Sequence, residues 1–217
     1  MEVPAYLADT YWWAYVHPRA VRIFERQWLV NLILWGNFAR LRDAALAALG
    51  DCSTGRTLQI ACVYGDLTEK LSRGATCLEV ADVLPVQLDN LARKLRPSSR
   101  VRLVHADSRS LPMDSATYDR ALLFFLLHEQ PDAARRATLA EAMRVVKPGG
   151  RIVIVDYHRP FALNPLLLPM AGVLRALEPF ALDLWRHGIG EWLPRPPASL
   201  EKYTAFGGLY QAVVITP

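Results

Sequence analysis

Polar side chains that can bind a ligand or move a proton follow several apolar runs of this chain. They are Asp82, Asp107 with Ser108, His128 with Glu129, and Asp156 with His158. A carboxylate can accept the hydroxyl groups of a ribose or the amino group of an adenine, and an imidazole can act as a general base or ligate a metal. The pattern predicts a site for a nucleoside-like ligand with acid–base or metal chemistry beside it.

Each of these residues also has a purely structural interpretation. Asp82 can cap a following helix, although the turn at residues 58–68 favours contact with a ribose. Asp107 can be a simple turn residue. His128 can be a structural histidine, a general base or a metal ligand, and Glu129 can cap a helix or bind a hard metal ion.

The stretch Leu58–Thr68 is the turn around which these residues are arranged. It reads Leu-Gln-Ile-Ala-Cys-Val-Tyr-Gly-Asp-Leu-Thr, a short apolar run that turns at Gly65 and leads into a helix-like segment. Free backbone N–H groups and the helix dipole converge at a junction of strand, turn and helix. The stretch therefore predicts a binding place for a nucleotide-like ligand.

Strand-like and helix-like segments alternate from Arg56 onward, which predicts a doubly wound α/β sheet. The wholly apolar run Ala121–Leu127 fits a central parallel strand that is buried on both faces. Residues 207–215 are expected to form a closing strand pair. The other expected strands are 76–81, 101–104 and 151–155, and the expected helices are 84–95 and 133–146, the second stopped by Pro148-Gly149-Gly150.

The chain is expected to be one domain in three parts. Residues 1–50 form a helical lid rich in aromatic residues, residues 56–158 form the core, and residues 159–217 form an apolar helical insert followed by closing strands. The aromatic residues of the first part either pack on the core, cover a flat apolar substrate or dip into lipid headgroups.

Composition restricts the class of protein. The chain has 217 residues, of which 52% are apolar, and a net charge of +4. Its arginines are scattered, so no nucleic-acid partner is expected. The three cysteines lack the spacing of a metal site and are expected to be reduced. No signal peptide or membrane span is recognised, and a cytoplasmic location is expected.

Residues 56–158 resemble class I S-adenosylmethionine (SAM) methyltransferases, which implies a Rossmann-like sheet, mostly parallel with a C-terminal antiparallel strand. The supporting matches are Leu111-Pro112-Met113-Asp114, Tyr118-Asp119, Leu127-His128-Glu129 and the stretch Glu141–Arg151. The first motif of that family is an acidic residue followed by three spaced glycines. Here Gln59 takes the acidic position, Ala61 and Val63 take two glycine positions, and only Gly65 is kept.

The whole chain resembles the RquA family of rhodoquinone-biosynthesis proteins, which is related to the ubiquinone and menaquinone methyltransferases. The resemblance is carried by Tyr6–Pro18 and by the altered turn Val63–Thr68. It implies an enzyme that replaces a ring methoxy group of ubiquinone with an amino group, with SAM as the amino donor and manganese (Mn2+) as the divalent metal. Because polyprenyl quinones lie in the bilayer, it also implies peripheral contact with the inner membrane. It fixes no oligomeric state.

The resemblance and the positions of the strand ends together suggest roles for individual residues. The expected cofactor-binding residues are Gln59, Ala61, Cys62, Val63, Gly65, Asp82, Val83, Asp107, Ser108 and Phe124. The expected catalytic residues are Tyr64, Asp66 and His128, and the expected metal ligands are His128 and Glu129. The expected substrate residues are Tyr11, Trp12, His17 and Trp35.

The bulk of Val63 and Tyr64 suggests why the transferred group would change. A glycine turn lets the methionine part of SAM lie against the backbone, whereas side chains here are expected to push it outward and turn its α-amine toward the quinone. Two alternatives stay open. The chain can be a conventional quinone or phenol methyltransferase. It can also be a non-catalytic partner protein of the same fold, which the loss of two glycines and of the acid at Gln59 would support.

Overall fold

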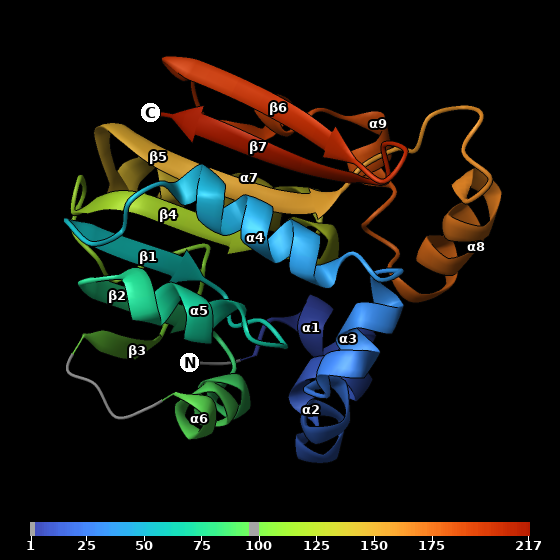
Figure 1. The fold of residues 1–217 in the computed structure, drawn as a ribbon, viewed down its shortest axis with the longest axis horizontal. Helices are drawn as coiled ribbons and strands as arrows, with labels where there is room; N and C mark the ends of the chain where they lie inside the picture. The colour runs from blue at the N-terminus through green and yellow to red at the C-terminus, as the bar shows by residue number, and fades with distance from the viewer. Residues whose placement is uncertain (1–2, 96–99) are drawn as a thin grey trace.

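A mixed seven-stranded sheet forms the centre of the protein (Figure 1). The computed structural model describes residues 3–95 and 100–217. The strands are β1 Arg56–Ile60, β2 Cys77–Asp82, β3 Val101–His105, β4 Tyr118–Phe124, β5 Val146–Tyr157, β6 Ser199–Ala205 and β7 Tyr210–Thr216. Their order is β3-β2-β1-β4-β5-β7-β6, in which β1 to β5 are parallel and β7 is antiparallel to both neighbours. The predicted Rossmann-like fold class is confirmed.

Helices cover both faces of the sheet and gather beyond one of its ends. The α-helices are α1 Ala5–Thr10, α2 Pro18–Phe24, α3 Gln27–Ile33, α4 Phe38–Leu49, α5 Leu67–Gly74, α6 Pro85–Lys94, α7 Asp132–Val145, α8 Leu167–Leu177 and α9 Asp183–Arg186. Short turns of other helix types are η1 Trp12–Val16, η2 Leu127–Glu129 and η3 Ile189–Trp192. No helix in the described part of the chain is long and apolar enough to cross a membrane.

The central strand β4 shows why the sheet needs helices on both faces. Leu122 and Phe124 pack into the core cluster that includes α4 and α5, whereas Ala121 and Leu123 pack into the cluster that includes α7. All four side chains are at most 2% exposed. Alternate residues of a strand point to opposite faces, so a run that is apolar throughout is buried on both.

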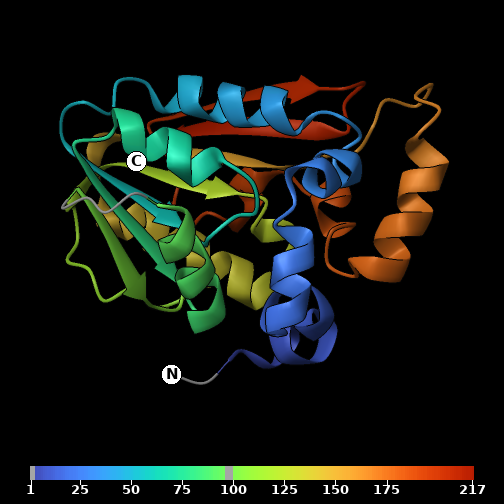
Figure 2. The same cartoon turned by 60° about the horizontal axis from the view of Figure 1, so that its bottom comes forward.

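The carboxyl ends of the parallel strands meet a separate layer of helices. Figures 1 and 2 show α1, α2 and α3 on one side of this end of the sheet, and α8 projecting on the other side. Ligands of open α/β sheets bind outside the carboxyl ends of the strands. The N-terminal helices and α8 therefore surround the place where a ligand is expected.

Three expected boundaries are wrong, and left-handed backbone explains two of them. Strand β4 ends at Phe124 rather than at residue 127, because Phe125 has a left-handed φ of 52° and starts the turn into η2. The closing pair is β6 with β7, and Gly207 and Gly208, at φ of 63° and 86°, form the turn between them. Strand β5 already begins at Val146, so the segment that follows α7 belongs to this strand.

The turn after β1 is tightly enclosed at Gly65. Its φ is +83°, and a Cβ on this residue would lie 2.6 Å from the ring Cζ of Phe38 and 3.1 Å from Oε1 of Gln27. Side chains rarely adopt this backbone region, and the space beside it is already filled. Gly65 is therefore required by both φ and packing.

We expect Gly65→Ala to lower the free energy of unfolding by roughly 1–3 kcal/mol, because both backbone strain and the Phe38 contact would oppose the native turn. Urea unfolding followed by tryptophan fluorescence measures the change. Gly172→Ala is the matched control, since Gly172 lies in α8 with no atom within 4 Å of its added Cβ. It should leave the protein as stable or more stable by up to about 1 kcal/mol. Equal stability of the two variants would contradict this account of the turn.

Candidate active site

Two adjoining cavities lie at the carboxyl ends of the parallel strands. The smaller one has a volume of about 60 Å³ and the larger one about 650 Å³. Both are lined by Tyr15, Cys62, Gln87, Phe125 and Glu129. The turn after β1 and the turn after β4 thus form a common wall between them.

Asp82 lines the smaller cavity and organises its floor. Its carboxylate accepts the N–H groups of Cys62 and Leu84, each at 2.7 Å. Helix α6 begins at Pro85 with Leu84 at the N-cap position, so Asp82 is not the helix cap. Burial raises the pKa of Asp82 to about 6, against the two N–H groups that lower it. Each carboxylate oxygen can accept a further hydrogen bond, such as one from a ribose hydroxyl.

Asp107 and Ser108 also line the smaller cavity, but both already have partners. The Asp107 carboxylate pairs with the Arg109 guanidinium, with Nη2 at 2.6 Å from Oδ2. Burial would raise the pKa of Asp107, but the bonds from Arg109 lower it below its usual value. The Ser108 hydroxyl lies 2.8 Å from that of Thr138. A contact from Asp107 to an adenine would therefore add to an existing turn interaction.

The N-terminal segment fills most of the smaller cavity. Tyr6 and Leu7 of α1 and Tyr15 of η1 line it, together with Val83. About 60 Å³ holds a few water molecules, whereas ligand pockets usually measure several hundred Å³. A nucleoside can therefore enter only if the N-terminal segment moves aside.

The turn after β1 keeps a glycine-like backbone despite its side chains. Ala61 has a φ of 72°, in the left-handed region that glycine adopts most easily. Gln59 is fully buried, donates from its amide to the Ala61 carbonyl at 3.0 Å and accepts from the Thr68 hydroxyl at 3.0 Å. The residue in the acidic position thus bonds within the protein, and Ala61 retains the turn with a Cβ attached.

Tyr64 connects this turn to the N-terminal segment. Its hydroxyl donates to the Ala14 carbonyl at 2.7 Å and accepts from the Gln87 amide at 2.9 Å. Its ring stacks on Tyr15 at 5.7 Å and on Phe24 at 6.1 Å between centroids. Both Tyr64 and Val63 line the larger cavity. Their bulk is therefore on the side of the turn that faces this cavity.

The polar end of the larger cavity is built from His128, Glu129 and Glu178. Imidazole Nε2 of His128 lies 3.7 Å from Oε1 of Glu129 and 3.9 Å from Oε2 of Glu178. The other ring nitrogen, Nδ1, lies 3.0 Å from Oδ1 of Asp156, which is fully buried at the end of β5. Asp156 therefore fixes the ring so that Nε2 faces the two glutamates.

Burial and mutual repulsion change the protonation of this cluster. Burial opposes the charge of His128, but Asp156 and the two glutamates outweigh it and raise its pKa to about 9. Burial raises the pKa of Glu129 to about 8, with His128 partly offsetting it, and burial also raises the pKa of Glu178. At neutral pH His128 is therefore a cation beside largely protonated Glu129.

The side chains of the polar end do not form a ready-made metal site. Among residues 3–95 and 100–217, no three His, Cys, Asp or Glu side chains are placed as ligands of one ion. His128, Glu129 and Glu178 offer the imidazole and carboxylate donors that Mn2+ accepts. Their separations of 3.7 and 3.9 Å exceed the roughly 3 Å expected between neighbouring ligands that bind one ion at about 2.1 Å. The residues present do not fit a bound metal without rearrangement.

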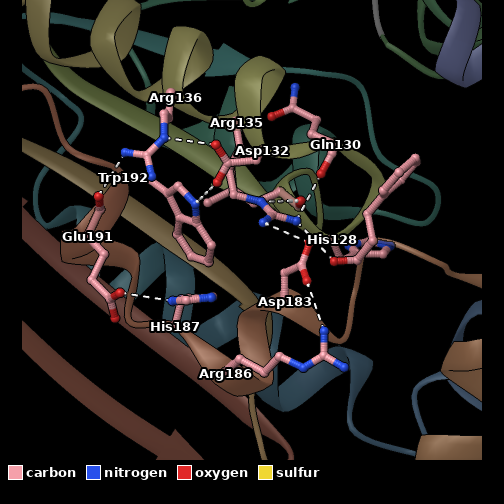
Figure 3. Close-up of polar contacts among 12 residues, drawn as sticks. His128, Gln130, Asp132, Arg135, Arg136, Asp183, Arg186, His187, Glu191 and Trp192 are labelled. Atoms are coloured by element: carbon pink, nitrogen blue, oxygen red, sulfur yellow. Dashed lines mark hydrogen bonds and ion pairs between the residues drawn. The ribbon is translucent and has the colours of Figure 1, made fainter.

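Arg135 of α7 anchors the turn that carries His128 (Figure 3). Its Nε donates to the Leu127 carbonyl at 3.0 Å, and Nη2 donates to the carbonyls of Gln130 at 2.9 Å and Phe180 at 3.0 Å. The guanidinium is fully buried and lies 4.4 Å from the ring centroid of Trp192. It therefore joins η2 to the segment that follows α8.

The structure brings only some of the expected residues together. Tyr64, Val63, Phe124, Trp35, His128 and Glu129 line the larger cavity, and Cys62 lines both. Asp66 lines neither cavity, because Arg42 binds its carboxylate at 2.6 Å. Trp12 and His17 are exposed and line neither, and Tyr11 is fully buried beside Glu178. Asp66, Trp12 and His17 are thus separated from the chemical cluster.

Sequence reasoning missed Glu178 and Arg135. Glu178 lies in an apolar stretch that had been interpreted as a helical insert, and nothing in that stretch indicates that it returns to the strand ends. Arg135 carried a usable signal, because it shares the helical spacing of the buried residues Thr138, Leu139 and Ala142. A cation on the buried face of a helix indicates a structural anchor.

Comparisons with known proteins agree with this geometry. Residues 57–150 match the family described as "Methyltransferase domain". The chain is 35% identical over 161 residues to the ubiquinone/menaquinone biosynthesis C-methyltransferase UbiE of Syntrophotalea carbinolica, covering 71% of this chain and 64% of that protein. It is 33% identical over 130 residues to the demethylmenaquinone methyltransferase of Clavibacter sepedonicus, covering 60% of this chain and 52% of that protein. The chain thus spans between about half and two thirds of the length of these relatives.

A solved structure shares the fold. The N-methyltransferase NodS from Bradyrhizobium japonicum WM9 superposes with a TM-score of 0.60 at 14% identity, covering 82% of this chain and 94% of NodS. At this identity the likeness concerns the fold alone. It includes the sheet whose strand ends carry the two cavities.

We expect the variant Glu129→Gln to lose less free energy of unfolding than the native protein as the pH rises. Folded Glu129 has a pKa of about 8 against an ordinary value of 4.5, so the unfolded state releases its proton first. This component of stability is present below about pH 4.5 and is lost as pH rises through 8. The variant should gain on the order of 3–4 kcal/mol relative to the native protein between pH 5 and 8. Urea unfolding at both pH values, with a chelator present, measures the difference.

Glu201→Gln is the control for this prediction, because Glu201 is exposed in β6. Its stability should run parallel to that of the native protein across the same pH range. If the stability of Glu129→Gln also runs parallel, Glu129 is ionised in the folded protein at neutral pH and its pKa is not raised by burial.

Proposed function

We propose that this chain, whose residues 57–150 form a domain of the class I SAM methyltransferase superfamily, is a SAM-dependent transferase acting on a polyprenyl quinone. We further propose that it converts ubiquinone to rhodoquinone, with the amino group of SAM replacing a ring methoxy group. The observation that carries the proposal is the apolar cavity of about 650 Å³ whose polar end holds His128, Glu129 and Glu178. A flat ring with a long hydrocarbon tail has this combination of surfaces.

SAM would occupy the smaller cavity and the wall it shares with the larger one. Asp82 would accept the ribose hydroxyls, and Asp107 would accept from the adenine amino group. The turn Ala61–Gly65 would contact the methionine part. When bound, SAM supplies an activated sulfonium and a primary amine. The residues fit this placement once α1 has moved, because Tyr6 and Leu7 now line the space that the adenosine would need.

The quinone would lie in the larger cavity with its ring at the polar end. Phe125 and Tyr157 line this end and pack edge-on against His128, at 5.9 and 5.0 Å between centroids. The named relatives are methyltransferases of ubiquinone or menaquinone biosynthesis, which supports a quinone as the acceptor. The ring carbonyl would accept a hydrogen bond from Nε2 of protonated His128.

The order of pKa values assigns the acid and the base. His128, with a pKa of about 9, would donate to the quinone oxygen and stabilise the negative charge that develops there. The smaller ionised fraction of Glu129, with a pKa of about 8, would take the proton of the attacking amine. A carbon–nitrogen bond would then form at the methoxy-bearing carbon, and methanol would leave, giving a SAM-linked aminoquinone. The quinone ring would accept two electrons as the bond between this nitrogen and Cα of SAM becomes an imine, and hydrolysis of the imine by water would release the amino-bearing quinol and a keto acid derived from SAM. Reoxidation of the quinol by a second quinone would give rhodoquinone. Of the roles left open for His128 by the sequence, this proposal favours an acid over a general base.

The side chains of Val63 and Tyr64 support amino rather than methyl transfer. Tyr64 is held by two hydrogen bonds and two stacked rings, so it cannot easily yield to a ligand. Methyl transfer requires the sulfonium methyl to be in line with the acceptor at about 3 Å. A filled turn would displace the methionine part from that alignment and leave its amine toward the cavity.

Methyl transfer is the second candidate, because both named relatives are methyltransferases and UbiE, a C-methyltransferase, is 35% identical to this chain over 161 residues. It would use the same two cavities with the methyl group toward the quinone. Manganese stays a prediction of the RquA resemblance, supported by the donor types of His128, Glu129 and Glu178 but not by their spacing. A non-catalytic partner protein is a further alternative, which calorimetric titration with SAM would test.

The product mass distinguishes these functions. Purified protein would be incubated with ubiquinone, manganese and SAM that carries a heavy-nitrogen amine and a heavy-carbon methyl group. We expect heavy nitrogen in the quinone in place of a methoxy group, and no heavy carbon. Transfer of heavy carbon would instead establish a methyltransferase. Absence of both products, together with no calorimetric binding of SAM, would overturn the enzyme assignment.

We expect the double variant Val63→Gly with Tyr64→Thr to lower amino transfer by roughly 10-fold or more, because the methionine part could settle against the turn. The rate of labelled rhodoquinone formation measures the change. Tyr64→Phe is the matched control, since it keeps the ring bulk and loses only the bonds to Ala14 and Gln87. Undiminished amino transfer in the double variant would refute the steric argument while leaving the quinone assignment intact.

We expect Asp156→Asn to lower turnover by roughly 100-fold and to move the alkaline limb of the pH–rate profile to lower pH. The variant removes the carboxylate that favours protonated His128, so the pKa of His128 should fall from about 9. A turnover loss with an unmoved alkaline limb would mean that Asp156 only supports the fold. Circular dichroism would confirm that the variant is folded.

A further inference from the structure

The rim of the larger cavity is exposed and apolar. Six large hydrophobic residues both line this cavity and are exposed to solvent. They are Trp13, Leu32, Ile33, Trp35, Val173 and Leu177. Most belong to α3 or α8, so the cavity opens to solvent between these helices across hydrocarbon side chains. A rim of this kind is suited to a hydrocarbon environment rather than to water.

The apolar surface continues beyond the rim. Within the described residues, fourteen large hydrophobic side chains are exposed, and only Leu200 and Tyr203 lie outside residues 12–35 and 161–177. Trp28, at 61%, and Leu168, at 80%, extend the surface along α3 and α8 without lining the cavity. Figures 1 and 2 both place α3 and α8 at the same end of the molecule. The exposed residues are therefore gathered at that end.

The charges around this surface are of one sign. Six exposed arginines there make no ion pair with any described residue: Arg19, Arg22, Arg26, Arg40, Arg159 and Arg175. Residues 10–41 contain a single acid, Glu25, which is bound to Lys94 at 2.6 Å, and residues 159–177 contain none. Tryptophan and arginine beside aliphatic side chains are the composition of surfaces that bind at the headgroup level of anionic membranes.

We propose that α2, α3 and α8 form a docking face for an anionic lipid bilayer, and that the larger cavity opens from this face into the acyl region. The proposal rests on the proposed function, because a polyprenyl quinone would then enter sideways between α3 and α8 without crossing water. Trp35 marks the junction of the two helices, where its indole N–H lies 3.1 Å from the Met170 sulfur. The ring of the quinone would reach His128 while its tail stays in lipid.

Flotation with vesicles tests the docking face without quinone or SAM. The full chain should float with vesicles of phosphatidylcholine and phosphatidylglycerol, and at least 10-fold less with phosphatidylcholine alone. The double variant Trp28→Glu with Leu168→Glu should lose at least 10-fold of the binding. Leu200→Glu with Tyr203→Glu, on β6, is the matched control and should bind like the native protein. Absence of vesicle binding by the native chain overturns the proposal.

Two further measurements separate this proposal from its alternatives. If the face is covered by a second copy of the chain, gel filtration will show a dimer that the Trp28→Glu/Leu168→Glu variant dissociates, and the bilayer assignment fails. With vesicle-embedded long-tailed ubiquinone, this variant should raise KM at least 10-fold, but it should not change turnover of a tail-less soluble quinone. Vesicle binding without turnover of any quinone would leave the docking face standing and refute the proposed function.

Discussion

The buried carboxylate of Asp156 is the constraint on which the candidate site depends. A charge without solvent must be compensated by hydrogen bonds or by an opposite charge. Asp156 accepts the N–H groups of Leu127 and His128 at 2.8 and 3.2 Å and faces Nδ1 of His128 at 3.0 Å. One side chain at the end of β5 therefore fixes both the turn after β4 and the orientation of its imidazole. Arg135 holds the same turn from the opposite side by binding the Leu127 and Gln130 carbonyls.

The N-terminal segment and the turn after β1 form one interaction network. Tyr64 and Gln87 bind the carbonyls of Ala14 and Tyr15, while Glu25 accepts the N–H of Gly65 at 3.1 Å. The Gly65 N–H and the Tyr64 hydroxyl of the turn are thus both engaged by the N-terminal region, whose residues Tyr6, Leu7 and Tyr15 line the smaller cavity. Movement of that segment would release these groups and open the space at the same time. Access for a cofactor and completion of its binding turn are therefore coupled.

The sequence predicted the features that depend on local patterns. The apolar run in β4 indicated a strand buried on both faces. Most of the polar residues after the strands lie around the two cavities, but His158 binds the Gly208 carbonyl and lines neither. The failures arise where a distant residue decides the outcome. Asp66 is captured by Arg42 from α4, and Glu178 returns to His128 from the far side of α8. Neither pairing leaves a periodic signal. The strand end at Phe124 depends on a left-handed residue that no propensity specifies.

The apolar surroundings of the larger cavity limit how many groups at its polar end can be charged at the same time. His128, Glu129, Glu178 and Asp156 are all largely buried, so full ionisation of the three carboxylates would leave a net negative charge in an apolar surrounding. Burial raises the pKa of Glu129, whereas the neighbouring carboxylates outweigh burial and raise the pKa of His128. Such a cluster retains a cation that can donate to a quinone oxygen and holds a carboxylate that is partly protonated near neutral pH. An amine that attacks a ring needs a group that takes up its proton and, beside it, a hydrogen-bond donor. Transfer of a methyl group to a substrate that is already ionised depends less on a group that takes up a proton. One imidazole surrounded by three carboxylates therefore supplies both groups that the proposed amino transfer would need.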